Sequence, residues 1–86
     1  MPANQKVFTE IKREKYDIFR QDLREKAIVP PFGDNGFLRG GGGLFADLTY
    51  DEPSETLSLR VRETPKGETY DSFFRKIEDV LQGIAV

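Results

Sequence analysis

The chain has 86 residues, of which 37% are hydrophobic and 33% charged, and its 13 basic and 15 acidic side chains give a net charge of −2. It contains neither cysteine nor histidine, which excludes disulfides, thiolate nucleophiles, zinc fingers and histidine-based catalysis. Acidic and basic residues are interspersed, without the basic face that general nucleic-acid binding requires, so nucleic acid is not expected as a partner.

The length fits one small domain over residues 1–86, and no internal repeat indicates a second one. The first residues, MPANQKVFTEIK, lack the apolar run of a signal peptide, and no stretch approaches the roughly 20 apolar residues that cross a bilayer. We therefore expect a cytoplasmic protein without a membrane partner. A chain of this size buries only roughly 60–65% of its unfolded surface, so self-association would add useful stability.

A first helix is predicted over residues 4–27, because this segment is rich in Lys, Arg, Glu and Gln and has no Gly or Pro. Asn4 is its expected N-cap. Its apolar arc is broad and contains Lys12 and Lys15. Two interpretations stay open: the lysine stems lie on the core while their ammonium groups reach water, or part of the arc contacts a partner. The apolar residues of the arc are Val7, Phe8, Ile11, Tyr16, Ile18, Phe19 and Leu23.

A loop is predicted over residues 28–43. Pro30-Pro31 ends the helix, and Asp34-Asn35-Gly36 favours a turn because Asn and Gly tolerate positive φ. Large apolar residues flank this turn, so we expect them to hold the loop against the core or against a partner. They are Phe32, Phe37 and Leu38.

Four consecutive glycines, Gly40–Gly43, end this segment. Glycine loses the most backbone entropy on folding, so the run needs a reason. Three interpretations stay open: a flexible hinge, a backbone nest that binds an anion beside Arg39, or a close crossing of two backbones. Neither Lys nor Ser/Thr follows the glycines, so the phosphate-binding GxxxxGK[ST] pattern is absent.

The strongest pattern is a β-hairpin over residues 44–64 with a turn at Asp51–Glu55. Apolar and polar residues alternate in both arms, so each arm has one apolar face. Both apolar sets must lie on one side of the sheet, which fixes the register to within a slip of two residues. The predicted pairs are Tyr50–Leu57, Asp47–Arg60 and Phe45–Arg62.

A second helix is predicted from Thr69, its expected N-cap, to Gly83, its expected C-terminal glycine. Asp71 in the first turn complements the helix dipole. Ile84 and Val86 are expected to pack onto the core beyond the helix. The apolar residues of the core-facing stripe are Phe73, Phe74, Ile77, Val80, Leu81 and Ile84.

Together these elements predict an α+β fold, a small two-layer α-β-β-α domain. In it, one antiparallel hairpin packs against an N-terminal and a C-terminal helix. A lone hairpin leaves both of its edges unpaired. We therefore expect a homodimer formed through strand edges or through the apolar parts of the first helix.

No residues assemble into an active site, so no enzymatic activity, cofactor or metal is predicted. The acidic hairpin turn lacks the calcium-loop pattern. Arg60, Arg62 and Phe45 form a small basic and aromatic group, but Asp47 lies among them. We predict a small non-enzymatic protein-interaction or accessory module, or alternatively a small-molecule or anion binder that uses the glycine-rich loop and Arg39. The predicted binding residues are Phe37, Leu38, Arg39, Gly40 and Gly41.

Overall fold

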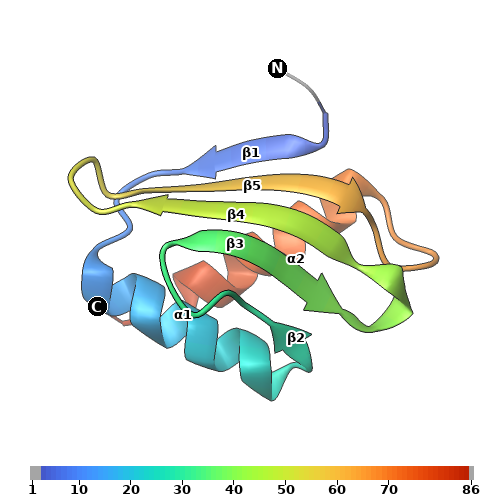
Figure 1. Ribbon diagram of the computed structural model, residues 1–86, viewed down its shortest axis with the longest axis horizontal. Coiled ribbons are helices and arrows are strands. Elements are labelled where there is room, and N and C mark those ends of the chain that lie inside the picture. The colour runs from blue at the N-terminus through green and yellow to red at the C-terminus, as the bar shows by residue number, and fades with distance from the viewer. Residues whose placement is uncertain (1–2, 86) are drawn as a thin grey trace.

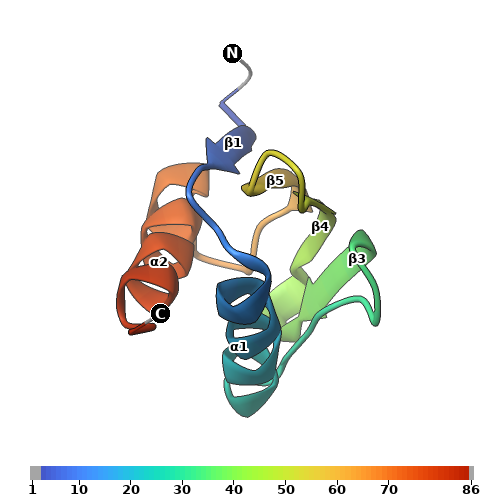
Figure 2. The ribbon, with the colours of Figure 1, turned by 90° about the vertical axis from the view of Figure 1, so that its left-hand side faces the viewer.

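A computed structural model of the protein describes residues 3–85. Within this range, five strands form one antiparallel sheet in the order β1-β5-β4-β3-β2, and two helices lie against one of its faces (Figures 1 and 2). The elements are β1 (Gln5–Phe8), α1 (Arg13–Glu25), β2 (Ile28–Val29), β3 (Asn35–Gly40), the 3₁₀ helix η1 (Gly41–Gly43), β4 (Phe45–Asp51), β5 (Thr56–Glu63) and α2 (Tyr70–Gln82). The α+β class is confirmed, but the sheet has three strands beyond the predicted hairpin, so the α-β-β-α order does not describe the fold.

The predicted hairpin is formed by β4 and β5. Its register is confirmed at two of the three predicted pairs, Tyr50–Leu57 and Asp47–Arg60. A bulge between Phe45 and Ala46 shifts the third pair, so Phe45 lies opposite Glu63 instead of Arg62. Such a bulge adds one residue to one strand and shifts the pairing beyond it. The side chains that face the helices are buried: Ala46, Leu48, Tyr50, Leu57, Leu59 and Val61.

The start of the predicted first helix is wrong. Gln5–Phe8 forms β1, which pairs with β5, and α1 begins only at Arg13, with Lys12 at its N-cap position. Asn4 does not cap a helix, because its side-chain amide donates to the Val61 carbonyl over 3.0 Å. Pairing with an available strand edge outweighs the small helix propensity of this four-residue segment.

The predicted loop over residues 28–43 is also wrong, since it contains β2 and β3. Asn35 and Gly36, expected in a turn, begin β3, which pairs with β4 from Asn35 to Arg39. Pro31 packs directly against Gly36, where a Cβ would lie 2.6 Å from the Cβ of Pro31. The glycine therefore permits the close approach of the preceding segment.

Both edges of the hairpin are thus covered, one by β1 and the other by β3. The outer strands of the sheet are β1, with four residues, and β2, with two. Short outer strands offer little backbone to a second chain. The unpaired hairpin edges that favoured a homodimer do not exist, and the homodimer itself stays a prediction.

Within the glycine run, Gly42 corresponds to a close crossing of two backbones. It has a φ of +75°, and a Cβ there would lie 3.3 Å from the Cβ of Pro65. The Lys66 amide donates to the Gly42 carbonyl over 3.0 Å. The glycine run therefore joins β3 to β4 and packs directly against the segment that connects β5 to α2.

The second helix agrees with its prediction. Thr69 caps α2 and exchanges hydrogen bonds with Ser72, and the helix ends at Gln82. Gly83 follows as the C-cap with a φ of −75°, in the ordinary helical region. Ile84 is buried as predicted, whereas Val86 lies outside the described residues.

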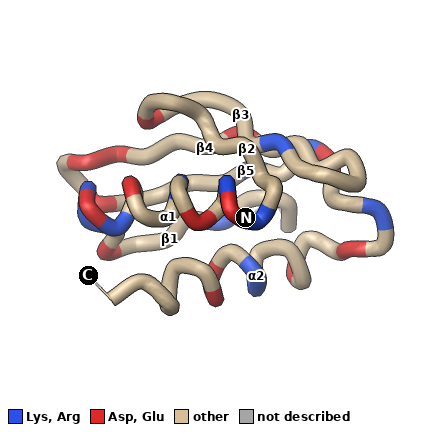
Figure 3. The backbone as a smooth tube through the Cα atoms, turned by 90° about the horizontal axis from the view of Figure 1, so that it is seen from below, with Lys and Arg blue, Asp and Glu red and all other residues tan. Residues whose placement is uncertain are grey.

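The core lies between the two helices and the inner face of the sheet. Tyr16, Phe19 and Leu23 of α1 are fully buried in it, while Lys12 is exposed and Lys15 half-buried. Figure 3 shows acidic and basic residues interspersed along α1. Among the described residues, no helix combines the length and the apolar composition needed to cross a membrane.

Candidate functional site

The open face of the sheet is the candidate binding surface. Both helices cover the opposite face (Figure 2), so the outward side chains of the strands face solvent. Strand pairing brings these side chains into rows that cross the sheet. One row contains Val29, Arg39 and Phe45, and the next contains Phe37, Asp47, Arg60 and Gln5.

On this face, toward the start of β4 and the ends of β3 and β5, two phenylalanines and two arginines form a cluster. We call it the aromatic–arginine patch (Phe37, Arg39, Phe45 and Arg62). The ring centroids of Phe37 and Phe45 are 5.1 Å apart. The guanidinium carbon of Arg39 lies 5.2 Å from the Phe45 centroid, and that of Arg62 lies 5.7 Å from both centroids. Each such cation–π contact stabilises an exposed arginine by about 0.5–1 kcal/mol. The cations and rings therefore hold one another in place while Phe37 remains 47% exposed.

The charge around the patch is mixed. Asp47 accepts a hydrogen bond from Arg62 Nε over 2.9 Å. Arg60 lies directly opposite Asp47 in the register, as predicted. The ion pair nevertheless forms with Arg62, which lies diagonally across the two strands. By strand alternation, Arg39, Arg60 and Arg62 share this face with Asp47 and Asp51, and Glu63 lies opposite Phe45 in the register. Arg39 and Arg60 make no ion pair with any described residue, so both remain available to acidic groups of a partner.

The five predicted binding residues do not share one surface. Phe37 and Arg39 lie on the open face, but Leu38 between them points inward and is fully buried, because successive side chains of a strand alternate. Gly40 ends β3 beside Leu44, and Gly41 belongs to η1. The anion nest of Arg39 and the glycine run stays a prediction.

Sequence reasoning placed Phe45 and Arg62 on the outer face of the hairpin, separately from Phe37 and Arg39. Only the pairing of β3 with β4 joins the two groups into one patch. The alternation within NGFLRG was the available signal, but Asn-Gly also favours a turn.

The segment between β2 and β3 carries a second exposed aromatic residue. Phe32 is 94% exposed, so it does not hold the loop against the core as one interpretation expected. Other residues fix the loop instead: the Tyr16 hydroxyl donates to the Gly33 carbonyl over 2.8 Å, and Arg13 donates to both oxygens of Asp34 over 2.7 and 2.8 Å. The loop is therefore ordered while its aromatic side chain points to solvent.

The electrostatics of this loop agree with its geometry. The hydrogen bonds from Arg13 hold the pKa of the Asp34 carboxyl below its usual range. Burial raises the pKa of Tyr16 to about 12, so its hydroxyl remains a donor to Gly33 at neutral pH. Both interactions are consequently intact under physiological conditions.

Within residues 3–85, no three His, Cys, Asp or Glu side chains come together as a metal-binding group. Comparison of the chain with protein-family models, curated proteins and solved structures returned no match. The functional argument therefore depends on the chemistry of the surface itself.

Proposed function

We propose that the protein is a small non-enzymatic interaction module that binds another protein through the aromatic–arginine patch. The observation that carries this proposal is the paired phenylalanines, flanked by arginines, on the one sheet face that no helix covers. Aromatic residues and arginine are enriched among the residues that dominate binding energy at protein interfaces. Because the patch is built on paired strands, little conformational entropy would be lost when it binds.

The unpaired Arg39 beside the two rings suits a protein surface with an acidic group next to an apolar centre. A second copy of the chain is a less favourable occupant, because a two-fold axis through the patch would bring arginines against arginines. The homodimer is therefore a separate proposal that needs another surface. Sedimentation equilibrium at micromolar concentration tests it, and a single species near 9.8 kDa would exclude it.

The test compares two double variants with matched chemistry. Phe37→Ala with Arg39→Glu removes one ring and reverses one charge of the patch. Tyr70→Ala with Arg75→Glu makes the same changes at exposed positions of α2. Affinity purification followed by titration with the purified partner should show at least about 30-fold weaker binding for the first variant, equivalent to the loss of one dominant residue. The α2 variant should bind like the wild type.

Two results would contradict the proposal. The first is equal loss of the partner in both variants, which would place the interface elsewhere. The second is binding of labelled single-stranded oligonucleotides that weakens steeply with salt and depends on Phe37, since exposed aromatic residues also stack on bases. That result would identify a nucleic-acid binder.

A further inference from the structure

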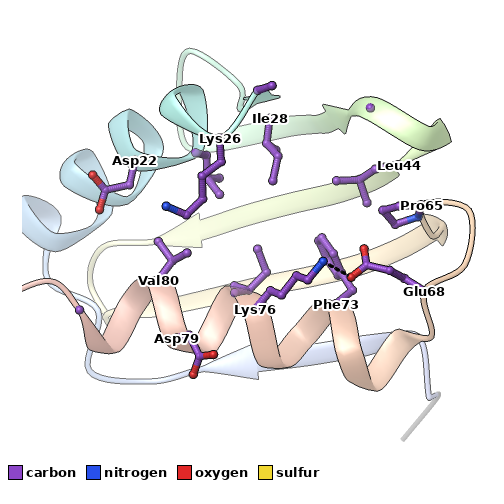
Figure 4. Close-up of a pocket in the computed structure, with 15 residues that line it drawn as sticks. Asp22, Lys26, Ile28, Leu44, Pro65, Glu68, Phe73, Lys76, Asp79 and Val80 are labelled. Atoms are coloured by element: carbon purple, nitrogen blue, oxygen red, sulfur yellow. Dashed lines mark ion pairs between the residues drawn. The ribbon is translucent and has the colours of Figure 1, made fainter.

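A cleft of about 760 Å³ lies between α1 and α2, on the side of the molecule opposite to the aromatic–arginine patch. Figure 4 shows the two helices as its walls with the sheet behind them. Its volume is within the range of ligand pockets, roughly 300–1,000 Å³. Its apolar lining includes Leu23, Ile28, Leu44, Phe73, Ile77 and Val80.

The apolar lining is closed at its base and open at its sides. Leu23, Phe73 and Ile77 are at most 2% exposed, so water does not reach the core through the cleft. Ile28 and Val80 pack against the core but are only half-buried. They leave apolar surface on opposite sides of the cleft that a hydrocarbon chain would cover.

The charged side chains of the cleft are not equivalent. Lys76 is paired with Glu68 along the α2 side of the cleft, whereas Asp79 points away from the cleft (Figure 4). Lys26 reaches over the cleft from α1 (Figure 4) and makes no ion pair with any described residue. Asp22 also lines the cleft one helical turn earlier, without pairing with Lys26. The Lys26 ammonium and the Asp22 carboxylate are thus both left without an ion pair among the described residues, and Lys26 is the cation available to an anionic ligand group.

We infer that this cleft binds a single-chain amphipathic carboxylate, with its hydrocarbon chain between Ile28 and Val80 and its carboxylate on the Lys26 ammonium. An unbranched chain suits a cleft with two helical walls and a sealed apolar base. A monoanionic head group matches one unpaired lysine. This site is independent of the proposed protein interaction, since it uses the other side of the molecule.

The experiment titrates the methyl-labelled protein with octanoate, decanoate and dodecanoate below their micelle concentrations and follows the NMR shifts. The methyl groups of Ile28, Leu44, Ile77 and Val80 should shift, whereas that of Val7 on the open face should not. Each added CH₂ that enters the cleft should lower Kd about fourfold. Dodecanol, which has the chain without the charge, should bind more weakly than dodecanoate.

Two variants test the head group and the chain. Lys26→Glu should weaken dodecanoate binding roughly two- to fivefold, as for a solvent-exposed ion pair, while Lys12→Glu, at an exposed position outside the cleft, should leave it unchanged. Val80→Asp should remove the dependence on chain length. A two-dimensional NMR spectrum verifies that each variant is folded. If a variant is unfolded, the titrations of the wild-type protein with the three carboxylates and with dodecanol still test the inference.

The inference is overturned by equal affinity for the three chain lengths, by equal affinity for dodecanol and dodecanoate, or by shifts centred on the open face. An amphipathic helical peptide that shifts the cleft methyl groups while no carboxylate does so would assign the cleft to a protein segment. Loss of the protein partner in the Phe37 variant has no bearing on these outcomes.

Discussion

The buried hydroxyl of Tyr50 provides a direct test of the fold. It donates to the Ile11 carbonyl over 2.6 Å, and both residues are 3% exposed. The Tyr50 ring stacks on Tyr16 with centroids 4.2 Å apart and planes 8° apart. Tyr50→Phe removes the hydroxyl and keeps the stacked ring, so its effect isolates one hydrogen bond that joins β4 to the segment between β1 and α1.

The expected cost follows from the group that remains. In the variant, the buried Ile11 carbonyl loses the hydrogen-bond donor that Tyr50 supplies, which costs about 1–3 kcal/mol in the free energy of unfolding. For a domain of this size, each kcal/mol lowers Tm by roughly 4–8 °C. A loss of about 2 kcal/mol in the free energy of unfolding would therefore lower Tm by roughly 8–16 °C.

Thermal unfolding followed by circular dichroism measures this change, and urea unfolding should show a lower midpoint at an unchanged m value. Tyr70→Phe is the matched control, because Tyr70 is 39% exposed, and it should leave Tm unchanged. If Tyr50→Phe and Tyr70→Phe unfold at the same temperature, the hydroxyl of Tyr50 does not occupy a buried, bonded position and the docking of the N-terminal segment is incorrect.

Three further outcomes are expected. Leu38→Ala should lower the free energy of unfolding by about 2–5 kcal/mol in urea, because Leu38 is fully buried; wild-type stability would show that its side chain does not belong to the core. Gly42→Ala should destabilise the protein by more than about 1 kcal/mol, because the φ of Gly42 is +75° and Pro65 is close. Gly41→Ala should be tolerated, because a Cβ at Gly41 would meet open space. Equal stability of the two variants would support a flexible hinge instead of a close crossing. Arg13 lowers the pKa of Asp34 in the folded state. The ion pair therefore stabilises the protein above the unfolded pKa near 3.8, and this stabilisation is lost as pH falls through the lower folded pKa. Asp34→Asn should reduce the acid dependence of the urea midpoint, and an unchanged acid profile would contradict the pairing.

Much of the fold could be predicted from local patterns. The alternation in the hairpin arms and the opposite charges of Asp47 and Arg60 were sufficient for the Tyr50–Leu57 register. A slip of one residue would expose an entire apolar face, and a slip of two would separate the two charges. The cap at Thr69 and the apolar stripe after it were sufficient for α2, because capping and 3.6-residue periodicity are local properties. In both cases the residues that determine the element are close together in the sequence.

The candidate surface depends on contacts that no local pattern contains. Two segments become strands because a neighbouring strand offers them unpaired backbone: Gln5–Phe8 pairs with β5, and Asn35–Gly40 pairs with β4. The partner of β1 lies about 50 residues further along the chain. Four residues such as QKVF are too few to distinguish a period of two from one of 3.6. The sequence alone therefore determined the hairpin, the C-terminal helix and the α+β class. Only the tertiary structure decided that Phe37 and Arg39 meet Phe45 and Arg62 on one face, because backbone pairing between strands, and not local propensity, brings those side chains together.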